Sequence, residues 1–196
     1  MSSKKVWSAD NQQVSQKISD EYLAGFVEGE GCFYIGFSKR RDLPLGWQII
    51  TEFRLSQNPG GKNILEFFRK RLDCGIIKRN HPKNPKDQSW VLVVRNRNDL
   101  RKKIIPFFQK HPLHSQKRQE FLIFKKVLRL VEEKKHLNKE GFAKIVHLVF
   151  SLERKTRKKY FPSELLATSE TICQTPTQGR RRYSPNSAAM RRVWQK

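Results

Sequence analysis

The stretch that most constrains this chain is residues 19–31, which read SDEYLAGFVEGEG. It opens with a serine and an aspartate, either of which is a good helix N-cap, and acidic residues there suit the positive end of a helix dipole. Gly25 and Gly29 share one face of the predicted helix, so another backbone can approach that face closely. We expect the helix to end near Glu28, which leaves the carboxylates of Glu28 and Glu30 at its C-terminal end.

The charge of the chain indicates its class of partner. Its 196 residues include 41 lysines and arginines against 18 aspartates and glutamates, for a formal net charge of +23. This length is sufficient for one buried core, so one domain with tails is expected. Such an excess of positive charge repels itself in a compact fold and favours a polyanionic partner, above all nucleic acid. The alternative that charge leaves open is a merely basic protein or a ribosomal-type binder, and charge indicates no chemistry.

Two other classes of protein find no support in the sequence. No segment approaches the roughly 18 consecutive apolar residues of a membrane span, and the N-terminus lacks the apolar core of a signal peptide. The three cysteines, Cys32, Cys74 and Cys173, form no CxxC or Cys/His cluster. We therefore expect no membrane partner and no zinc site, and a reducing compartment.

Two pairs of strands are predicted from alternating apolar and polar residues. The first pair comprises residues 32–38 and 47–57, joined by a basic turn. Strict alternation is typical of antiparallel strands with one face buried and the other free. An amphipathic helix follows, which we expect Gly75 to end, and residues 76–79 and 89–95 then form the second pair.

Three further helices are predicted after the second strand pair. Asn98 or Asp99 is expected to cap the first of them, and Pro106 to terminate or kink it. Ser115 can cap the longest helix, and Asn138 opens the last one. Their apolar stripes have helical spacing, which indicates core packing rather than a ligand site.

The order helix, two strands, helix, two strands, helices predicts an α+β fold of the αββαββα type. Its four antiparallel strands would form a sheet that helices cover on one face only. We expect a flexible N-terminal arm at residues 1–18, a domain at residues 19–155 and a basic tail at residues 156–196. The basic runs of that tail would add nonspecific affinity for phosphates.

The open face of the predicted sheet is a candidate DNA-binding surface. A two-stranded ribbon fits the major groove, where arginine pairs with guanine, glutamine with adenine, and a carboxylate such as Glu52 can accept from cytosine. A strand of about ten residues rises ~33 Å, about the length of ten base pairs, so one subunit could follow a half-site. The alternative is an ordinary solvated sheet face. The candidate DNA-binding residues are Tyr34, Ser38, Arg40, Arg41, Gln48, Ile50, Glu52, Arg54, Ser56, Lys78, Arg79, Asn80 and Arg95.

Residues 23–31, LAGFVEGEG, resemble the defining motif of the LAGLIDADG homing endonucleases, with glutamate at both acidic positions where aspartate is common. The resemblance extends over about residues 19–155, through the strand hairpin and the pair Ser56 and Gln57. The chain is similar to the single-motif members of the family, which act as homodimers on double-stranded DNA. The resemblance implies a metal-dependent endonuclease encoded in a mobile group I intron, and it favours an organelle (chloroplast or mitochondrial) genome, with a bacterial genome as the alternative.

Physical reasoning favours the same dimer, because no second motif of this kind occurs in the chain. One half-site reader with one carboxylate can cut one strand, and a two-fold dimer supplies the second copy of each. We expect the dimer interface at Ala24, Gly25, Glu28 and Gly29. Helix C-termini are negative, so clustering Glu30 from both chains there is unfavourable without a divalent cation. Mg²⁺ prefers oxygen ligands and suits a phosphate substrate.

The resemblance also assigns roles within the site. Glu30 would be the metal carboxylate, and the backbone carbonyl of Gly29 a further ligand. Gln57 would position solvent. Glu28 is interpreted instead as structural, capping or pairing near the helix end.

At the basic residue of the site this sequence departs from the pattern of the family. The family tends to place a lysine just before its long helix, but here Gln116 stands at that position when the register is anchored on Phe121. We favour Lys117 for the catalytic role, with Gln116 as the alternative. A helix-start lysine that only contacts phosphate is the competing interpretation of Lys117.

Two other functions are compatible with the same fold. An RNA-binding maturase would need no Glu30, and a DNA-binding regulator that has lost cleavage would gain nothing from clustered carboxylates. The presence of both Glu30 and Gln57 therefore favours the nuclease.

Overall fold

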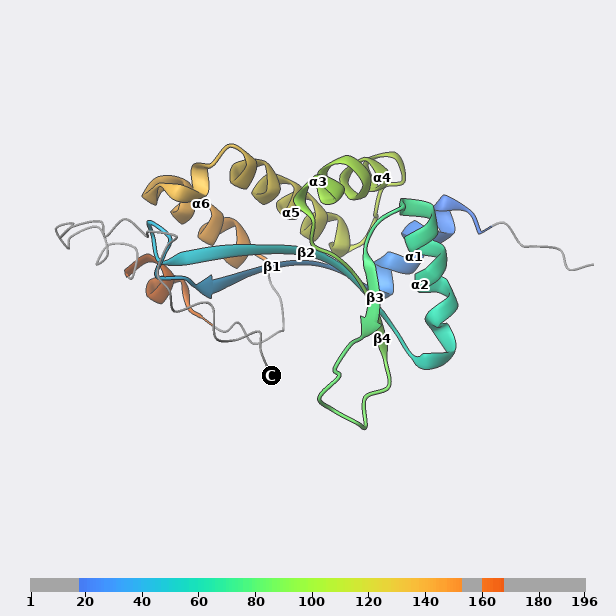
Figure 1. Cartoon of the computed structure of the whole chain (residues 1–196). Coiled ribbons are helices and arrows are strands. Elements are labelled where there is room, and N and C mark those ends of the chain that lie inside the picture. The colour runs from blue at the N-terminus through green and yellow to red at the C-terminus, as the bar shows by residue number, and fades with distance from the viewer. Residues whose placement is uncertain (1–17, 153–159, 168–196) are drawn as a thin grey trace, which may run out of the picture.

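The computed structural model describes residues 18–152 and 160–167. Its fold is α+β, as expected (Figure 1). A short helix at residues 162–167 follows the last element below. The elements are α1 (Asp20–Glu30), β1 (Gly31–Lys39), β2 (Trp47–Gln57), the 3-10 turn η1 (Pro59–Gly61), α2 (Lys62–Leu72), β3 (Ile76–Arg79), β4 (Trp90–Val94), α3 (Arg97–Asp99), the π-helical turn η2 (Leu100–Ile104), α4 (Ile105–Lys110), α5 (Gln116–Glu132), the 3-10 turn η3 (Lys135–Leu137) and α6 (Lys139–Phe150).

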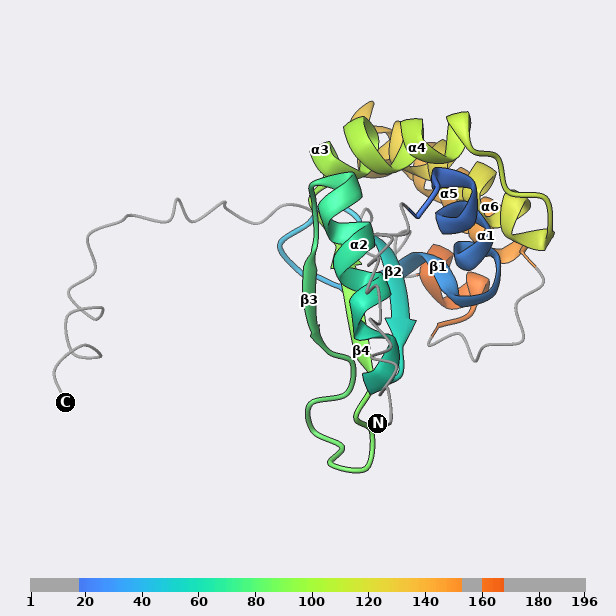
Figure 2. The same ribbon diagram turned by 90° about the vertical axis from the view of Figure 1, so that its right-hand side faces the viewer.

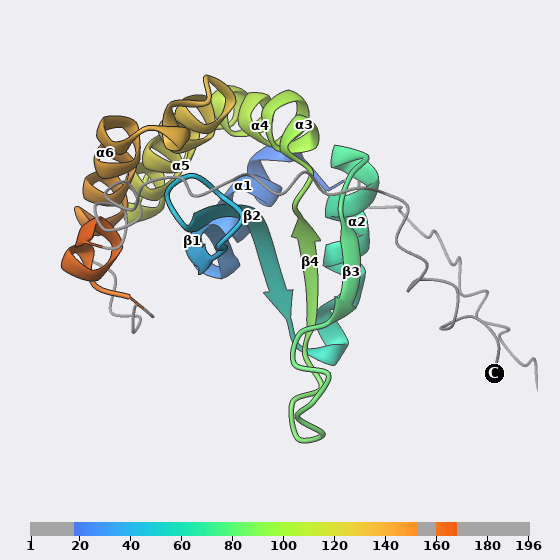
Figure 3. The same cartoon turned by 60° about the vertical axis from the view of Figure 1, so that its left-hand side comes forward.

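The sheet has the strand order β1-β2-β4-β3, and all neighbouring strands are antiparallel. Helices α3 to α6 lie over one side of the long β1–β2 pair, and the β3–β4 hairpin extends away from them (Figure 1). Helix α2 lies along the other half of the sheet, in contact with β2, β3 and β4 (Figure 2). The opposite face carries no helix within the described part of the chain (Figure 3).

The core lies between the helices and the sheet and is rich in phenylalanine. Phe33 of β1 is at its centre, with its ring centroid 5.3 Å from those of Phe108 and Phe121. The rings of Phe53 and Phe124 lie 5.5 Å from the same ring. Contacts at these distances join α4 and α5 to the β1–β2 pair through one aromatic cluster.

Helix α1 passes into strand β1 without a connecting loop. Ser19 is its N-cap, and the Ser19 hydroxyl accepts a hydrogen bond of 3.1 Å from the first turn. The helix continues to Glu30, further than the predicted end, and Gly31 is the first residue of the strand. A Cβ atom at Gly31 would lie 2.4 Å from Val27 Cγ1 and 2.8 Å from the Val27 carbonyl oxygen. The sharp change from helix to strand therefore requires glycine at this position.

The end of α2 differs from the prediction. Asp73, not Gly75, ends the helix, because Asp73 takes a left-handed conformation with φ of 49°. Aspartate tolerates this conformation better than most residues. Gly75 has φ of 89° and redirects the chain into β3.

The helical segment after β4 also differs from the prediction. Its N-cap is Asn96, whose side-chain oxygen accepts from the N–H groups of Asn98 and Asp99, the two residues expected to cap it. Pro106 does not terminate the helix, which continues through α4. The wider π-helical turn η2 lies directly before the turn that contains Pro106. A π-helical turn accommodates the proline, which has no N–H group to donate to the helix.

The caps of the last two long helices match the prediction. The Ser115 hydroxyl accepts from the Lys117 N–H at 3.1 Å at the start of α5. The Asn138 side-chain oxygen accepts from the Gly141 N–H at 2.8 Å at the start of α6.

Residues 160–167 pack against the domain, although the predicted boundary assigned them to the tail. Leu165 is fully buried and belongs to the hydrophobic core. The Tyr160 ring lies 4.8 Å from the Trp47 ring, between centroids. The rest of the predicted arm and tail, residues 1–17, 156–159 and 168–196, lies outside the described residues. Within residues 18–152 and 160–167, no helix combines the length and apolar character that a membrane span requires.

Replacing Leu165 with alanine tests this packing. We expect Leu165→Ala to lower the free energy of unfolding by about 2–5 kcal/mol, as buried leucine truncations do. Phe161→Ala is the control, because Phe161 is 72% exposed and its loss should cost no more than about 0.5 kcal/mol. Urea denaturation measures both variants. Equal, small effects would contradict the docking of residues 160–167.

Candidate active site and nucleic-acid interface

The junction of α1 and β1 sets the position of Glu30. Gly31 pairs with Leu55 in the β1–β2 register, so Glu30 lies at the same end of the sheet as Ser56 and Gln57. Two candidate site residues from separate parts of the chain, Glu30 and Gln57, are thereby brought together at that end.

Gln57 is held at the end of β2 by its neighbours in the following turn. A Cβ atom at Gly61 would lie 2.3 Å from Gln57 Oε1, so the absence of a side chain at Gly61 leaves room for the amide. The β2–β4 register pairs Gln57 with Trp90. Sequence reasoning selected Gln57 but missed the glycine that accommodates it.

The Glu30 carboxylate is exposed. Within residues 18–152 and 160–167 no hydrogen-bond or ion-pair partner of Glu30 is found. The helix face that leads to it is also uncovered, because nothing lies within 4 Å of a Cβ atom built at Gly25 or Gly29. Tyr22 on the same helix is 55% exposed. This end of α1 therefore offers an available carboxylate and a flat surface of small residues.

Glu28 has a structural role at the same end of α1. Its carboxylate accepts from the Ser115 hydroxyl and from the backbone N–H groups of His114 and Ser115 at the start of α5. At the other end of α1, the Asp20 carboxylate accepts from the Arg71 guanidinium of α2 at 2.6 Å. Helix α1 is thus fixed to a different helix at each end.

Hydrogen bonding shifts the acidity of Glu28. Partial burial alone would raise the pKa of its carboxyl group. The bonds from the Ser115 hydroxyl and from the N–H groups of His114 and Ser115 outweigh burial and hold this pKa below its ordinary value of 4.5. The carboxylate form therefore stabilises the fold.

The start of α5 carries both candidates for the basic residue. The Lys117 Nζ atom lies 3.3 Å from Glu120 Oε2, and both side chains are mostly buried. Among the described residues no contact joins Lys117 to Glu30. The hydrogen bond from the Ser115 hydroxyl to Glu28 nevertheless places Gln116 and Lys117 at the end of α1 that carries Glu30.

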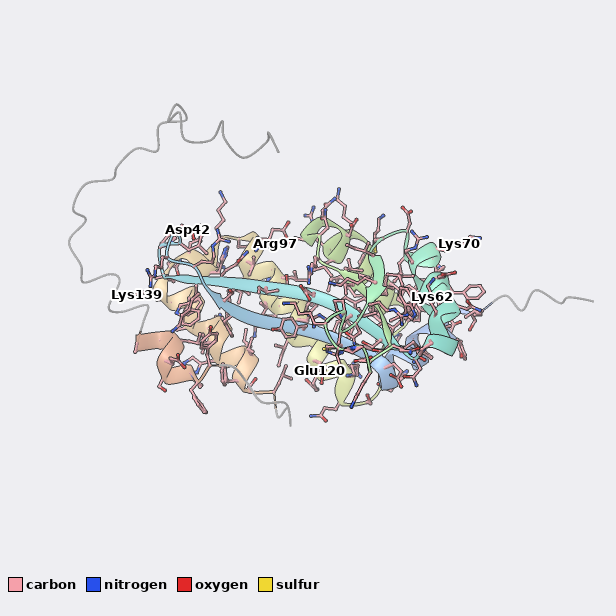
Figure 4. The ribbon with its side chains drawn as sticks, turned by 60° about the horizontal axis from the view of Figure 1, so that its bottom comes forward. Asp42, Lys62, Lys70, Arg97, Glu120 and Lys139 are labelled. Carbon is pink, nitrogen blue, oxygen red and sulfur yellow. The ribbon has the colours of Figure 1, made fainter. Side chains whose placement is uncertain are left out.

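The open sheet face carries most of the candidate DNA-binding residues. The buried side chains of β2 alternate with side chains of the open face, as predicted. Asp42 at the β1–β2 turn and Lys62 at the start of α2 lie toward opposite ends of the sheet (Figure 4). Of the candidates, Tyr34, Ser38, Gln48, Ile50, Arg54, Ser56 and Asn80 are half-buried, and Arg40, Arg41, Lys78 and Arg95 are exposed.

Two candidates are placed differently from the prediction. Glu52 is only 3% exposed, because Arg54 and Arg95 both pair with it. Arg79 lies on the helix side of the sheet, since it pairs with Trp90 and its guanidinium is 4.5 Å from the Trp90 ring. Adjacent strand residues point to opposite faces, so Arg79 cannot share the open face with Lys78.

One residue of the open face was missed by sequence reasoning. Ile76 of β3 is 65% exposed. It precedes Lys78 by two residues and therefore lies on the same face of the sheet. The period-two pattern of the strand was the signal that could have found it.

The residues present suit a divalent cation only as part of a larger site. Within the described residues no group of three or more histidine, cysteine or acidic side chains could hold a metal ion. Glu30 and the carbonyl of Gly29 supply oxygen donors, the kind that Mg²⁺ and similar hard cations prefer. Further oxygen ligands would come from outside these two residues, water among them.

The fold and the site define an α+β protein with an open basic sheet face and an exposed carboxylate at the end of its first helix. A family model described as LAGLIDADG endonuclease matches residues 23–128. The chain therefore belongs to the LAGLIDADG endonuclease family.

Relatives and solved structures agree with this assignment. The probable intron-encoded endonuclease Cox1-I1b of Schizosaccharomyces pombe is 30% identical over 145 residues, which is 74% of this chain and 35% of that protein. The DNA endonuclease I-CeuI of Chlamydomonas moewusii is 26% identical over 155 residues, 78% of this chain and 69% of that protein. The chain spans only 25% to 35% of the length of four relatives, including Cox1-I1b.

Two solved structures are similar over most of this chain. The homing endonuclease I-TnaI has 35% sequence identity and a TM-score of 0.67, covering 79% of this chain and 97% of that one. The archaeal intron-encoded homing endonuclease I-Vdi141I was solved in complex with DNA. It has 28% sequence identity and a TM-score of 0.71, covering 79% of this chain and 96% of that one.

Replacing Glu28 with glutamine tests its structural role through pH. Because its pKa is lower in the folded chain, Glu28 stabilises the fold above pH 4.5, and this contribution disappears as the pH falls through the folded-state pKa. We expect Glu28→Gln to cost about 1–2 kcal/mol of unfolding free energy at neutral pH and progressively less below pH 4.5.

The measurement is urea denaturation across the acid range. Glu66→Gln is the matched control, because the exposed Glu66 pairs with Lys62 at 3.4 Å on α2 and should contribute at most about 0.5 kcal/mol. A stability difference for Glu28→Gln that does not change with pH would contradict the assignment.

Proposed function

We propose that this chain is a site-specific, divalent-metal-dependent endonuclease that cuts both strands of DNA as a homodimer. The observation that carries the proposal is the exposed Glu30 carboxylate, placed by α1 at the end of an open basic sheet. A protein that only bound DNA would gain nothing from an unpaired acid there, since it repels phosphate. The DNA complex of I-Vdi141I and the name of I-CeuI support the same function.

The uncovered face of α1 supports the homodimer. Gly25 and Gly29 leave open space on this face, so a second α1 could pack at close range, whereas Ala24 is already buried within its own chain. A two-fold axis between two such helices would bring both Glu30 carboxylates to one place and extend the sheet surface over two half-sites.

The chain supplies oxygen donors for the metal site, namely Glu30 and the Gly29 carbonyl. Mg²⁺ is our proposal for the ion, because its preference for oxygen ligands fits this donor set and a phosphate substrate. When bound, a divalent cation would neutralise charge that develops on the scissile phosphate.

The remaining site residues would act directly on water and DNA. We assign to Gln57 the orientation of the attacking water, because it is a neutral donor and acceptor at the same sheet end as Glu30. Lys117, or Gln116 in its place, would help to hold the attacking water from the start of α5. The open sheet face would hold the half-site in register, with phosphate contacts fixing position and base contacts providing specificity.

The relatives also bear on the source of the gene. One relative is a protein in an ND4 intron of Podospora anserina and another is named for a Cox1 intron. We propose that this chain is likewise encoded in an intron of a mitochondrial or chloroplast genome.

Replacing Glu30 with glutamine tests the catalytic proposal. We expect Glu30→Gln to lower the rate of double-strand cleavage by about 100-fold or more while specific DNA binding remains, because the amide keeps the shape but loses the charge. Cleavage of plasmids carrying the intron-insertion sequence and gel-shift affinity measure the two effects. Glu140→Gln, an exposed acid on α6, is the control and should cleave normally. Full activity of Glu30→Gln would refute the mechanism.

Replacing Gly25 with leucine tests the dimer. A Cβ atom at Gly25 meets nothing within 4 Å in one chain, and leucine is a better helix former than glycine. The Gly25→Leu monomer should therefore remain folded but fail to dimerise and cleave, since the partner helix would clash.

Sedimentation equilibrium and thermal melting together read out the effect. Gly60→Leu is the matched control, because Gly60 also has open space but lies on the turn η1. A folded Gly25→Leu chain that dimerises like the wild type would overturn the proposed interface.

A further inference from the structure

One carboxylate on the open sheet face is hidden beneath two arginines. Glu52 is 3% exposed, although its strand position directs it to the open face. The Arg54 atoms Nε and Nη2 lie 2.6 and 2.5 Å from Glu52 Oε2, and Arg95 Nε lies 2.5 Å from Oε1. The arginine side chains cover both carboxylate oxygens and are themselves 39% and 57% exposed. The acid is therefore inaccessible, whereas the bases face outward.

A tyrosine holds one of these arginines from the neighbouring strand. Tyr34 is the cross-strand partner of Glu52, and its ring centroid lies 4.6 Å from Arg54 Cζ, a cation–π distance. The tyrosine ring lies over Gly36, where a Cβ atom would be 2.3 Å from the Tyr34 hydroxyl oxygen. Arg54 is thus fixed both by the carboxylate and by the ring.

This arrangement does not suit Glu52 as a reader of cytosine. Direct readout requires a carboxylate oxygen to accept from the cytosine amino group. Both oxygens of Glu52 already have guanidinium partners, and almost none of the residue is accessible. The arginines, in contrast, retain N–H donors beyond those that pair with Glu52, and arginine is the side chain that pairs with guanine O6 and N7.

We propose that Glu52 is a positioning residue that orients Arg54 and Arg95, and that the half-site carries guanine at the two positions these arginines face. The inference rests on the proposed function, because it concerns how the same sheet selects its DNA. Two side chains fixed before binding lose less rotamer freedom when DNA arrives, and their fixed directions discriminate more sharply between bases. The net charge of the cluster remains positive, so it also attracts the phosphate backbone.

The test is binding-site selection from randomised double-stranded DNA at fixed salt. Every chain carries Glu30→Gln, so that selection reports binding alone. In this background we compare Glu52→Gln, Arg54→Gln and Arg95→Gln. We expect each arginine variant to lose the guanine preference at one position. Glu52→Gln should weaken both preferences by about tenfold, within the range that one arginine–guanine pair supplies. Its affinity for random DNA should be equal or higher, because a negative charge is removed.

Two further variants separate positioning from a general effect on stability. Gly36→Ala adds a Cβ atom that must displace the Tyr34 ring, so it should weaken only the preference due to Arg54. Glu132→Gln removes an acid that pairs with Arg101 at 2.7 Å between α5 and η2, and its selected sequences should match those of the parent. Thermal melting verifies that each chain is folded.

The outcomes distinguish this inference from the proposed function. If Glu52→Gln leaves both guanine preferences intact, the positioning role is wrong. If it alters a position that neither arginine variant affects, Glu52 reads a base directly and the inference is likewise overturned. A parent chain that selects no sequence at all would refute the proposed function itself.

Discussion

The structure depends on the direct passage of α1 into β1 at Gly31. A side chain there would overlap Val27 of the preceding turn, so only glycine allows the strand to begin where the helix ends. Because no loop intervenes, the sheet register fixes the position of Glu30 beside the end of β2. The bonds of Glu28 to the start of α5 hold the same junction from the other side. A flexible linker would leave the carboxylate without a defined place.

Two glutamates occupy important positions in this strongly basic chain. The chain carries a formal net charge of +23, yet an acid lies at each of two key points. Glu30 remains exposed and has no partner among the described residues, as a group that binds an external cation should be. Glu52 is instead hidden by Arg54 and Arg95, so it shapes a basic surface without repelling DNA. Glu30 is thus exposed and available to an external cation, whereas Glu52 is buried and paired with arginines of its own chain.

Local signals in the sequence were sufficient for much of the fold. The alternation of residues 47–57 predicted β2 with its observed bounds, and Ser115 was recognised as a helix cap from its residue type. The features that the sequence did not predict depend on contacts between distant segments or on an unusual local backbone conformation. The π-helical turn that accommodates Pro106, and the left-handed Asp73, leave no pattern in the sequence. The burial of Glu52 requires Arg95, which directly follows β4 far along the chain, and alternation cannot reveal this pairing.

The central claim is that two copies of this chain meet through α1 and that each must contribute Glu30. A subunit-mixing titration tests it most directly: wild-type chain and the Glu30→Gln variant are mixed at constant total concentration before DNA and Mg²⁺ are added. If both subunits are needed, double-strand cleavage falls as the square of the wild-type fraction. A fall in direct proportion to that fraction would show that one chain acts alone and would contradict the account.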